Sequence, residues 1–386
     1  MNTNKQIYLD YAASTPVDDE VLHSMLPYFS NDFGNASSIH YFGQKAEAAI
    51  ERSRMELAGQ LNCEPDEIIF TSGGTESDNL AIRGTAFAEK RRKKASKILI
   101  SPVEHHAVAK TAEDLAKYFG FTVEYLPVDS TGAVVLEEVE RRIDEKTAIV
   151  SVIYGNNEIG TINPIEELTR ICHAKGVSFH SDAVQAGGYL PIDLQKVGID
   201  LLSLGAHKFY GPKGVGVLYI RKGLRIQNIQ TGGSHEFGMR AGTQNTAYIA
   251  GMAKAYKITR KYLDSYNQKY RKQVRYLFDH LTQKISGIHK TGADLNKRLP
   301  NHLSLVFEGV DGNQLVAILA QKGFAVSSGS ACKTGSPEPS GVLLAMGIDP
   351  ELAMGSLRIT LGRQTTDQEL NEFIPALRDA VEVCRK

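Results

Sequence analysis

Two side chains that suit carbonyl chemistry follow apolar runs in the middle of the chain. Asp182 ends one such run, and Lys208 follows Leu201–Leu204 inside a glycine-rich turn. A buried carboxylate needs a cationic partner, and a protonated pyridine nitrogen is one. A lysine whose pKa is lowered by its surroundings is a nucleophile that can form an imine. Each residue alone also has an ordinary interpretation, Asp182 as a helix cap and Lys208 as a solvated loop lysine.

A glycine-rich turn follows another buried-strand signal, Ile68–Phe70. Strand, glycine-rich turn and helix in this order aim free backbone N–H groups at an anion. Gly73 and Gly74 allow a close approach of the backbone, and Thr75 adds a hydroxyl. The spacing matches neither common nucleotide-binding glycine motif. The motif alone therefore leaves open an ordinary turn, with a helix starting near Ser77, or an anion site.

Cys332 lies in a different setting from the other three cysteines. The segment Ser327–Ser340 is rich in Ser, Gly and Pro, which predicts a mobile loop. Lys333 adjoins the thiol and favours its nucleophilic thiolate form. Cys172, inside a helical pattern, is expected to be a buried apolar residue. Because no cysteines have CxxC spacing, we expect neither a metal site nor a dithiol redox pair.

The elements that must position these groups alternate between strands and helices from about residue 60 to 220. Helical spacing is found in segments such as Ala107–Phe119 and Ile165–Lys175. Strands are predicted at Glu67–Thr71, Lys97–Ser101, Phe121–Leu126, Thr147–Tyr154, Val177–Ser181, Ile199–Leu204 and Val215–Ile220. This alternation predicts an α/β domain with a mostly parallel sheet covered by helices, and ligands of such sheets bind beyond the carboxyl ends of the strands.

The pattern changes after a long helical stretch, roughly Asn245 to Ile285. A β-α-β pattern follows, and the last helix is expected to open with a capping box at Thr366–Glu369. We interpret this part as a smaller α+β domain. The expected division is a large domain at residues 16–262 and a small domain formed by residues 1–15 and 263–386.

Composition excludes several classes of partner. The chain has 386 residues, with 44 Lys plus Arg and 44 Asp plus Glu, so it offers no global attraction to nucleic acid or to an anionic membrane. No window of about 18 apolar residues predicts a membrane span. The N-terminus has no apolar signal region, so a cytoplasmic location with reduced thiols is expected.

The order and spacing of these groups resemble the fold-type I pyridoxal-phosphate enzymes, and more narrowly the class I cysteine desulfurases. The match extends over nearly the whole chain and includes Tyr8–Ala13, Phe70–Asn79, Val103–His105, Asn156–Gly160, Gly205–Gly214, Gly238–Thr243 and Ser327–Cys332. The resemblance implies a large domain with a seven-stranded sheet, the cofactor pyridoxal 5'-phosphate, and removal of sulfur from L-cysteine. The products would be L-alanine and a persulfide on Cys332.

The resemblance also assigns roles at the ring end of the cofactor. Lys208 would attach the cofactor and later move the substrate Cα proton. Asp182 would pair with the pyridine N–H, and Gln185 would hydrogen-bond the ring oxygen. His105 would stack on the ring face and shuttle protons. No metal is implied.

Further roles concern the phosphate and the substrate. The phosphate would be held by Gly74, Thr75, Gly205 and His207, and the substrate carboxylate by Asn157 and Arg358. Thr243 would reach the phosphate of the partner subunit, which implies an obligate homodimer. Similar enzymes usually carry serine at position 205, and losing one hydrogen bond to a charged group costs about 1.5–3 kcal/mol. Ala241 also stands where serine is common. Weaker cofactor binding is therefore expected.

Two competing interpretations remain at this stage. Another fold-type I enzyme, such as an aminotransferase or a selenocysteine lyase, would share the cofactor residues but have less need of a loop thiol. A catalytically idle scaffold would have no use for Lys208, Asp182, His105 and Cys332. The sulfur acceptor stays open between an iron–sulfur scaffold protein, a tRNA-thiolation enzyme and a DNA-sulfur-modifying system.

Overall fold

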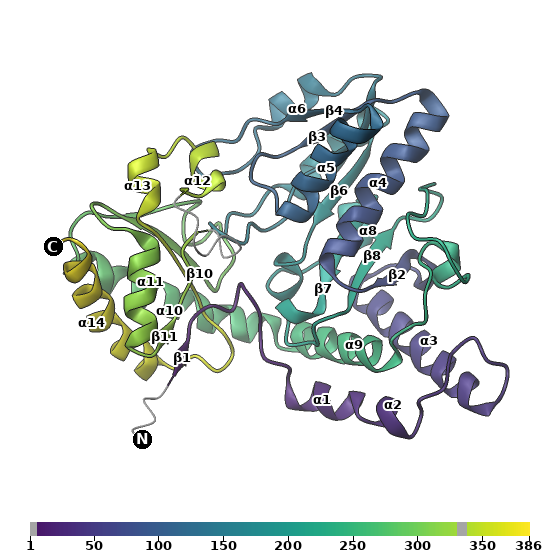
Figure 1. The fold of residues 1–386 in the computed structure, drawn as a ribbon, viewed down its shortest axis with the longest axis horizontal. Helices are drawn as coiled ribbons and strands as arrows, with labels where there is room; N and C mark the ends of the chain where they lie inside the picture. The colour runs from purple at the N-terminus through teal and green to yellow at the C-terminus, as the bar shows by residue number, and fades with distance from the viewer. Residues whose placement is uncertain (1–5, 330–337) are drawn as a thin grey trace.

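A seven-stranded sheet runs through the larger body of the protein (Figure 1). This computed structural model describes residues 6–329 and 338–386. The spatial order of the strands is β2-β8-β7-β6-β5-β3-β4. Their bounds are β2 Ile68–Thr71, β3 Lys97–Ile100, β4 Thr122–Tyr125, β5 Thr147–Ser151, β6 Ser178–Asp182, β7 Leu201–Gly205 and β8 Gly216–Ile220. Every strand predicted for this sheet is confirmed, with small displacements at the ends.

The sheet is parallel except at β8, which pairs antiparallel with both β2 and β7. Successive side chains of a strand point to opposite faces, and both faces are apolar. Ile69 joins one buried cluster, and its neighbour Phe70 joins the other. The prediction of a mostly parallel sheet buried on both sides is therefore confirmed. The carboxyl ends of β6 and β7 lie side by side, with Asp182 opposite Ser203.

Helices cover both faces of this sheet (Figure 1). Those within the strand–helix alternation are α4 Gly74–Lys93, α5 His106–Phe119, α6 Leu136–Arg142, α7 Ile165–Ala174 and α8 Leu194–Val197. Short 3-10 turns lie at Pro65–Glu67, Ala186–Gly188, Ala206–Lys208 and Glu236–Gly238. The expected start of α4 near Ser77 is wrong, because the helix begins at Gly74. Gly73, with φ 152°, takes a backbone conformation that favours glycine and turns the chain straight from β2 into the helix.

The segment expected to be one long helical stretch after residue 245 is two helices. They are α9 Thr246–Lys261 and α10 Leu263–Lys284, and the chain leaves helical geometry at Tyr262. α9 packs against α1 Asp19–Met25 and α3 Tyr41–Leu61, whereas α10 packs against α14 Asp367–Cys384. The break follows from these different partners, because α9 turns its apolar face toward α1 and α3, whereas α10 turns its apolar face toward α14. A further helix, α2, spans Pro27–Ser30.

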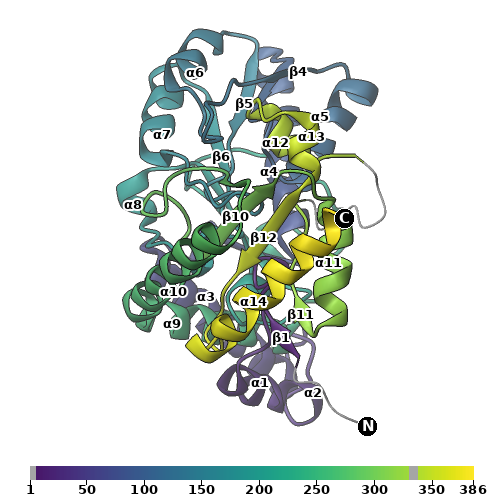
Figure 2. The ribbon, with the colours of Figure 1, turned by 90° about the vertical axis from the view of Figure 1, so that its left-hand side faces the viewer.

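Two small sheets complete the C-terminal body (Figure 2). β9 Ile288–Lys290, β10 His302–Phe307 and β12 Ser356–Thr360 are antiparallel, and β1 Ile7–Tyr8 pairs with β11 Phe324–Ala325. The remaining helices are α11 Gly312–Gln321, α12 Gly341–Ala345 and α13 Pro350–Met354. α14 opens with the expected capping box, in which Thr366 Oγ1 accepts the N–H of Glu369 at 3.2 Å. The domain boundaries at residues 15 and 262 stay a prediction. Within the described ranges, no helix has the length and apolarity to cross a membrane.

Candidate active site

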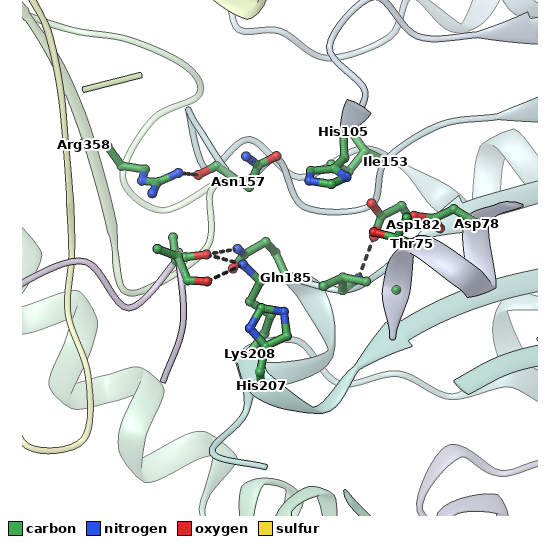
Figure 3. Close-up of a pocket in the computed structure, with 14 residues that line it drawn as sticks. Thr75, Asp78, His105, Ile153, Asn157, Asp182, Gln185, His207, Lys208 and Arg358 are labelled. Atoms are coloured by element: carbon green, nitrogen blue, oxygen red, sulfur yellow. Dashed lines mark hydrogen bonds between the residues drawn. The ribbon is translucent and has the colours of Figure 1, made fainter. Parts of the chain in front are cut away.

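A cavity of about 410 Å³ opens beyond the carboxyl ends of β6 and β7 (Figure 3). Its wall brings together most of the site residues predicted from the sequence. They are Gly74, Thr75, His105, Asn157, Asp182, Gln185, His207, Lys208 and Arg358. This is the place where parallel sheets bind ligands.

Lys208 points into this cavity from the short turn that follows β7. Its Nζ donates to the carbonyl oxygens of Ala12 at 2.6 Å and Ala13 at 2.9 Å (Figure 3). Nε2 of Gln185 donates to the same Ala12 oxygen at 2.6 Å. The N-terminal segment therefore closes one side of the cavity. The interpretation of Lys208 as a solvated loop lysine is wrong, because the side chain is half-buried among these groups.

Asp182 ends β6, is buried and lines the same cavity. Burial raises the pKa of its carboxyl group, while the neighbouring His105 and Lys208 act in the opposite direction. One oxygen accepts the N–H of Val184 at 2.9 Å, so Asp182 also caps the local turn. The cap interpretation and the cofactor interpretation are therefore compatible.

His105 is the N-cap of α5, and this role fixes its protonation. Nδ1 accepts the N–H of Ala107 at 3.1 Å, so the proton of the neutral ring lies on Nε2. Burial lowers the pKa of His105 and favours that neutral form. Its ring therefore reaches the cavity wall as an uncharged group with a donor at Nε2.

The N-terminus of α4 also lines the cavity, through Gly74 and Thr75. This helix has 20 residues and no side-chain N-cap, so its first N–H groups suit an anion. Gly205 does not line the cavity itself, but a Cβ at this position would lie 3.6 Å from the Gly74 nitrogen. Burial, with a smaller effect of Lys208, lowers the pKa of His207 to about 4. His207 is therefore a neutral hydrogen-bonding group at neutral pH.

Arg358 reaches the cavity from β12 and is only 1% exposed. One terminal nitrogen donates to the Asn157 carbonyl at 2.9 Å, and the other donates to Oδ1 of Asp10 at 2.8 Å. Nε is buried without a hydrogen-bond partner among the described residues. Oδ2 of Asp10 accepts the Ser327 hydroxyl at 2.9 Å. Asp10 thus ties the predicted substrate-binding arginine to the start of the Ser327–Ser340 segment.

Sequence reasoning assigned no role to Asp10, Asp78 or Glu104. Asp10 and Asp78 lie inside motifs that carried the resemblance, and Glu104 precedes His105. Glu104 is buried, with Oε1 accepting the Ser101 hydroxyl at 2.5 Å and the N–H of Ile153 at 2.7 Å. Burial raises the pKa of Glu104 to about 8. Motif membership was the available signal, but it does not say which contacts each carboxyl makes.

Besides Gly205, two predicted residues are not part of this cavity as the structure describes it. Thr243 lines a separate cavity of about 230 Å³ together with Ser72 and Arg240. Cys332 lies outside the described residues. The segment Ser327–Ser340 that contains it ends at Ser340, whose hydroxyl donates to Oε2 of Glu158 at 2.6 Å. Cys172 is fully buried, as expected.

Comparison with known proteins places the chain in a family. Residues 7–373 match the family model for aminotransferase class-V. "Cysteine desulfurase IscS" of Clostridium botulinum is 44% identical over 97% of this chain and 94% of that protein. A solved "NifS-like protein" superposes with a TM-score of 0.91 at 39% identity, covering 98% of this chain and 100% of that one. "SspA in complex with cysteine" has a TM-score of 0.80 at 34% identity and covers 92% and 98%. The chain therefore belongs to the aminotransferase class-V family of fold-type I enzymes, and within it to the class I cysteine desulfurases.

Proposed function

We propose that the protein removes sulfur from L-cysteine with pyridoxal 5'-phosphate attached to Lys208. The observation that carries the proposal is one cavity lined by the Lys208 amine, the Asp182 carboxylate and the uncapped N-terminus of α4. An aldehyde, a basic ring nitrogen and a phosphate need these three kinds of group. The match to curated desulfurases supports the same activity.

The described residues offer a suitable group for each part of this cofactor. Asp182 would hold the ring nitrogen, Gln185 the ring oxygen, and His105 the ring face. Gly74, Thr75, Gly205 and His207 would hold the phosphate. A Cβ at Gly74 would lie 2.5 Å from Cγ2 of Val184, so only glycine leaves the helix start this close to the cavity wall.

The chemistry follows from where the chain places its own groups. When bound, the cofactor supplies an electron-accepting ring that stabilises the charge left on the substrate after loss of its Cα proton. Lys208 accepts that proton, and Arg358 and Asn157 hold the substrate carboxylate. The Cys332 thiolate then attacks the substrate sulfur, so that an S–S bond forms and the C–S bond breaks. The substrate carbon takes the electron pair and a proton, and alanine leaves.

We further propose that the working unit is a homodimer that passes its sulfur to an acceptor protein. Large apolar side chains are exposed between residues 22 and 42, including Leu26, Phe29, Phe33, Ile39 and Tyr41. Exposed apolar side chains gathered in one stretch of the chain suit a second copy of the chain. The acceptor is an iron–sulfur scaffold or a tRNA-thiolation enzyme. A cytoplasmic location remains a prediction from the sequence.

The test is to incubate the protein with sulfur-labelled cysteine and to map the label by mass spectrometry. One labelled sulfur atom per chain is expected on Cys332, with one alanine formed for each. The Cys332→Ser variant should keep the absorbance of the bound cofactor and form no persulfide. Cys63→Ser, which alters a half-buried thiol far along the chain, is the matched control and should behave as the parent. Alanine formation by Cys332→Ser at the parent rate would remove that thiol from the reaction.

A further inference from the structure

A second buried carboxyl group lies beside Asp182, and the function proposed above does not use it. Asp78 stands on the second turn of α4, is 1% exposed and lines the same cavity (Figure 3). One oxygen of Asp78, one oxygen of Asp182 and one ring nitrogen of His105 lie within 4.8 Å of one another. Two carboxyl groups this close in a buried site cannot both be ionised without a large energetic cost.

The described surroundings of Asp78 supply no positive charge to hold it as an anion, although the Ser203 hydroxyl acts to lower its pKa. Its Oδ1 accepts no hydrogen bond from the described residues. The nearest basic nitrogen is Nε2 of His180 on β6, at 3.6 Å. His180 is neutral, because burial lowers its pKa to about 3, and its ring nitrogens contact the hydroxyls of Ser151 and Ser203. On the other side, the carboxyl of Glu104 adds to the unfavourable environment for a negative charge.

Asp182 has the opposite surroundings, although it is also buried. The Lys208 ammonium and the neighbouring His105 ring both favour its ionised form, and the N–H of Val184 donates to it. The two carboxyl groups are therefore not equivalent. The one that faces the basic side chains carries the charge, and the one that faces the helix and His180 carries the proton.

We propose that Asp78 is a positioning residue that holds the single proton of this carboxyl pair, so that Asp182 remains an anion facing the ring nitrogen of the cofactor. The identity of that cofactor rests on the proposed function, whereas the place of the proton is a property of the cofactor-free protein. Asp78 thus acts through Asp182 and needs no contact with the substrate.

The pH dependence of stability gives the first test. Burial, and then the charge of Asp182, raise the pKa of Asp78 well above its usual value. A raised acid pKa contributes stability below the unfolded value of about 3.9, and the contribution is lost as the pH rises toward the folded pKa. Asp78→Asn imitates the protonated form and has no proton to lose. In the cofactor-free protein, the melting temperature of this variant minus that of the parent should become more positive as the pH is raised from about 5 to 8.

A matched control shows the opposite behaviour. Asp200 is equally buried, but its oxygens pair with Arg221 at 2.8 Å and His173 at 2.9 Å. Asp200→Asn removes a charge that has partners, so this variant should melt below the parent at neutral pH. If Asp78→Asn also melts below the parent, and increasingly so as the pH rises, Asp78 is an anion and the proposal is overturned.

The second test measures cofactor affinity by absorbance titration of the cofactor-free protein with pyridoxal 5'-phosphate. Asp78→Asn should change the dissociation constant by less than about threefold, because the charge on Asp182 is preserved, whereas Asp182→Asn should weaken binding by about tenfold or more. Equal losses of cofactor affinity in the two variants would contradict the assignment of the proton to Asp78. If the parent itself binds no cofactor, the proposed function fails, while the melting comparison still decides the place of the proton.

Discussion

At the scale of single residues, Gly205 is the position where this chain departs from similar enzymes inside the site. Its backbone has φ −135° and ψ 121°, which any residue can adopt. An added Cβ would lie 3.3 Å from Cγ1 of Val184 and 3.6 Å from the Gly74 nitrogen. A side chain is therefore tolerated after a small movement of Val184, and a hydroxyl there would lie at the phosphate end of the cavity.

We expect Gly205→Ser to bind pyridoxal 5'-phosphate more tightly than the parent. One added hydrogen bond to a charged group contributes about 1.5–3 kcal/mol, or at least about tenfold in the dissociation constant. Gly205→Ala adds the same Cβ without the hydroxyl and should show no gain. Absorbance titration measures both variants. Equal affinities of the serine and alanine variants would show that the hydroxyl does not reach the phosphate.

Buried histidines make the stability of the protein depend on pH below neutrality. Burial lowers the pKa values of His180 and His302 to about 3. The unfolded chain takes up these protons below its usual pKa of about 6.5, so stability is lost as the pH falls from there. Each such histidine costs about 1.4 kcal/mol per pH unit between the two values.

The expected result is a free energy of unfolding that falls from pH 6.5 to 5. His302→Gln removes one of the protons taken up on unfolding. The fall should therefore be less steep by about 1.4 kcal/mol per pH unit. His23→Gln, which changes an exposed side chain, is the control and should leave the slope unchanged. Denaturant unfolding at several pH values measures the slope. A His302→Gln variant with the parent slope would mean that the buried ring is already protonated.

At the scale of elements, the N-terminal segment that follows β1 organises the site from outside the large sheet. Its carbonyl oxygens hold Lys208 and Gln185, and its Asp10 side chain holds Arg358 and Ser327. Thr360 on β12 binds the same segment through its hydroxyl, which accepts the N–H of Ala12 at 2.9 Å. One short extended segment therefore links Lys208 to Arg358.

Asp10→Ala should lower the free energy of unfolding by about 3 kcal/mol, because it leaves the buried Arg358 guanidinium without its carboxylate. It should also raise the KM for cysteine, since the arginine loses the contact that orients it. Ser327→Ala removes only one neutral donor to Asp10 and should cost about 1 kcal/mol. Denaturant unfolding and steady-state kinetics separate the two effects. Equal costs for both variants would contradict the pairing of Asp10 with Arg358.

The elements predicted from sequence and those missed differ in what determines them. The strands around Val150 and Leu202 are apolar on both faces, so their composition alone predicts buried parallel strands. The break at Tyr262 was missed because the local pattern is helical on both sides, and only the packing of α9 and α10 on different bodies ends the helix. The antiparallel placement of β8 likewise depends on its neighbours and not on its own residues.

In the candidate site, too, local pattern predicted some residues and tertiary packing determined the others. Lys208 and Asp182 were predictable because each lies at or just after the end of a strand, whereas His105, at the start of α5, was assigned only through the resemblance. Asp10 lies 348 residues from Arg358, and Asp78 lies on a helix rather than a strand end. The contacts of these two carboxyl groups come from tertiary packing, which no local pattern specifies.

At the scale of the whole molecule, the position of Thr243 gives the homodimer a specific test. Thr243 lies outside the cavity that contains Lys208, in agreement with a role in the site of the partner subunit. Lys208→Ala and Thr243→Ala should each weaken cofactor binding in homodimers. A mixed dimer of the two variants should contain one intact site, because one subunit supplies Lys208 and the other supplies Thr243. Absorbance titration of the mixed dimer should recover about half of the parent's tight sites, and no recovery would place Thr243 in its own subunit's site.

The exposed apolar surface between residues 22 and 42 gives an independent prediction about assembly. Ile39 is 93% exposed and Phe33 is 64% exposed, so both would be buried on pairing with a second copy. The double variant Phe33→Asp and Ile39→Asp should shift the protein from dimer to monomer in light scattering. Val383→Asp, which alters an exposed apolar residue on α14, should leave the dimer intact. A monomeric parent protein would contradict the proposed homodimer.

Reduction with borohydride followed by peptide mapping is the most direct test of the central claim, because it fixes the covalent link between an aldehyde cofactor and the amine that carries it. The holoenzyme should yield a single modified peptide with the added pyridoxyl group on Lys208. The Asp78→Asn variant should yield the same peptide. A modified lysine at any other position would show that the cavity beside Asp182 does not bind the cofactor through Lys208.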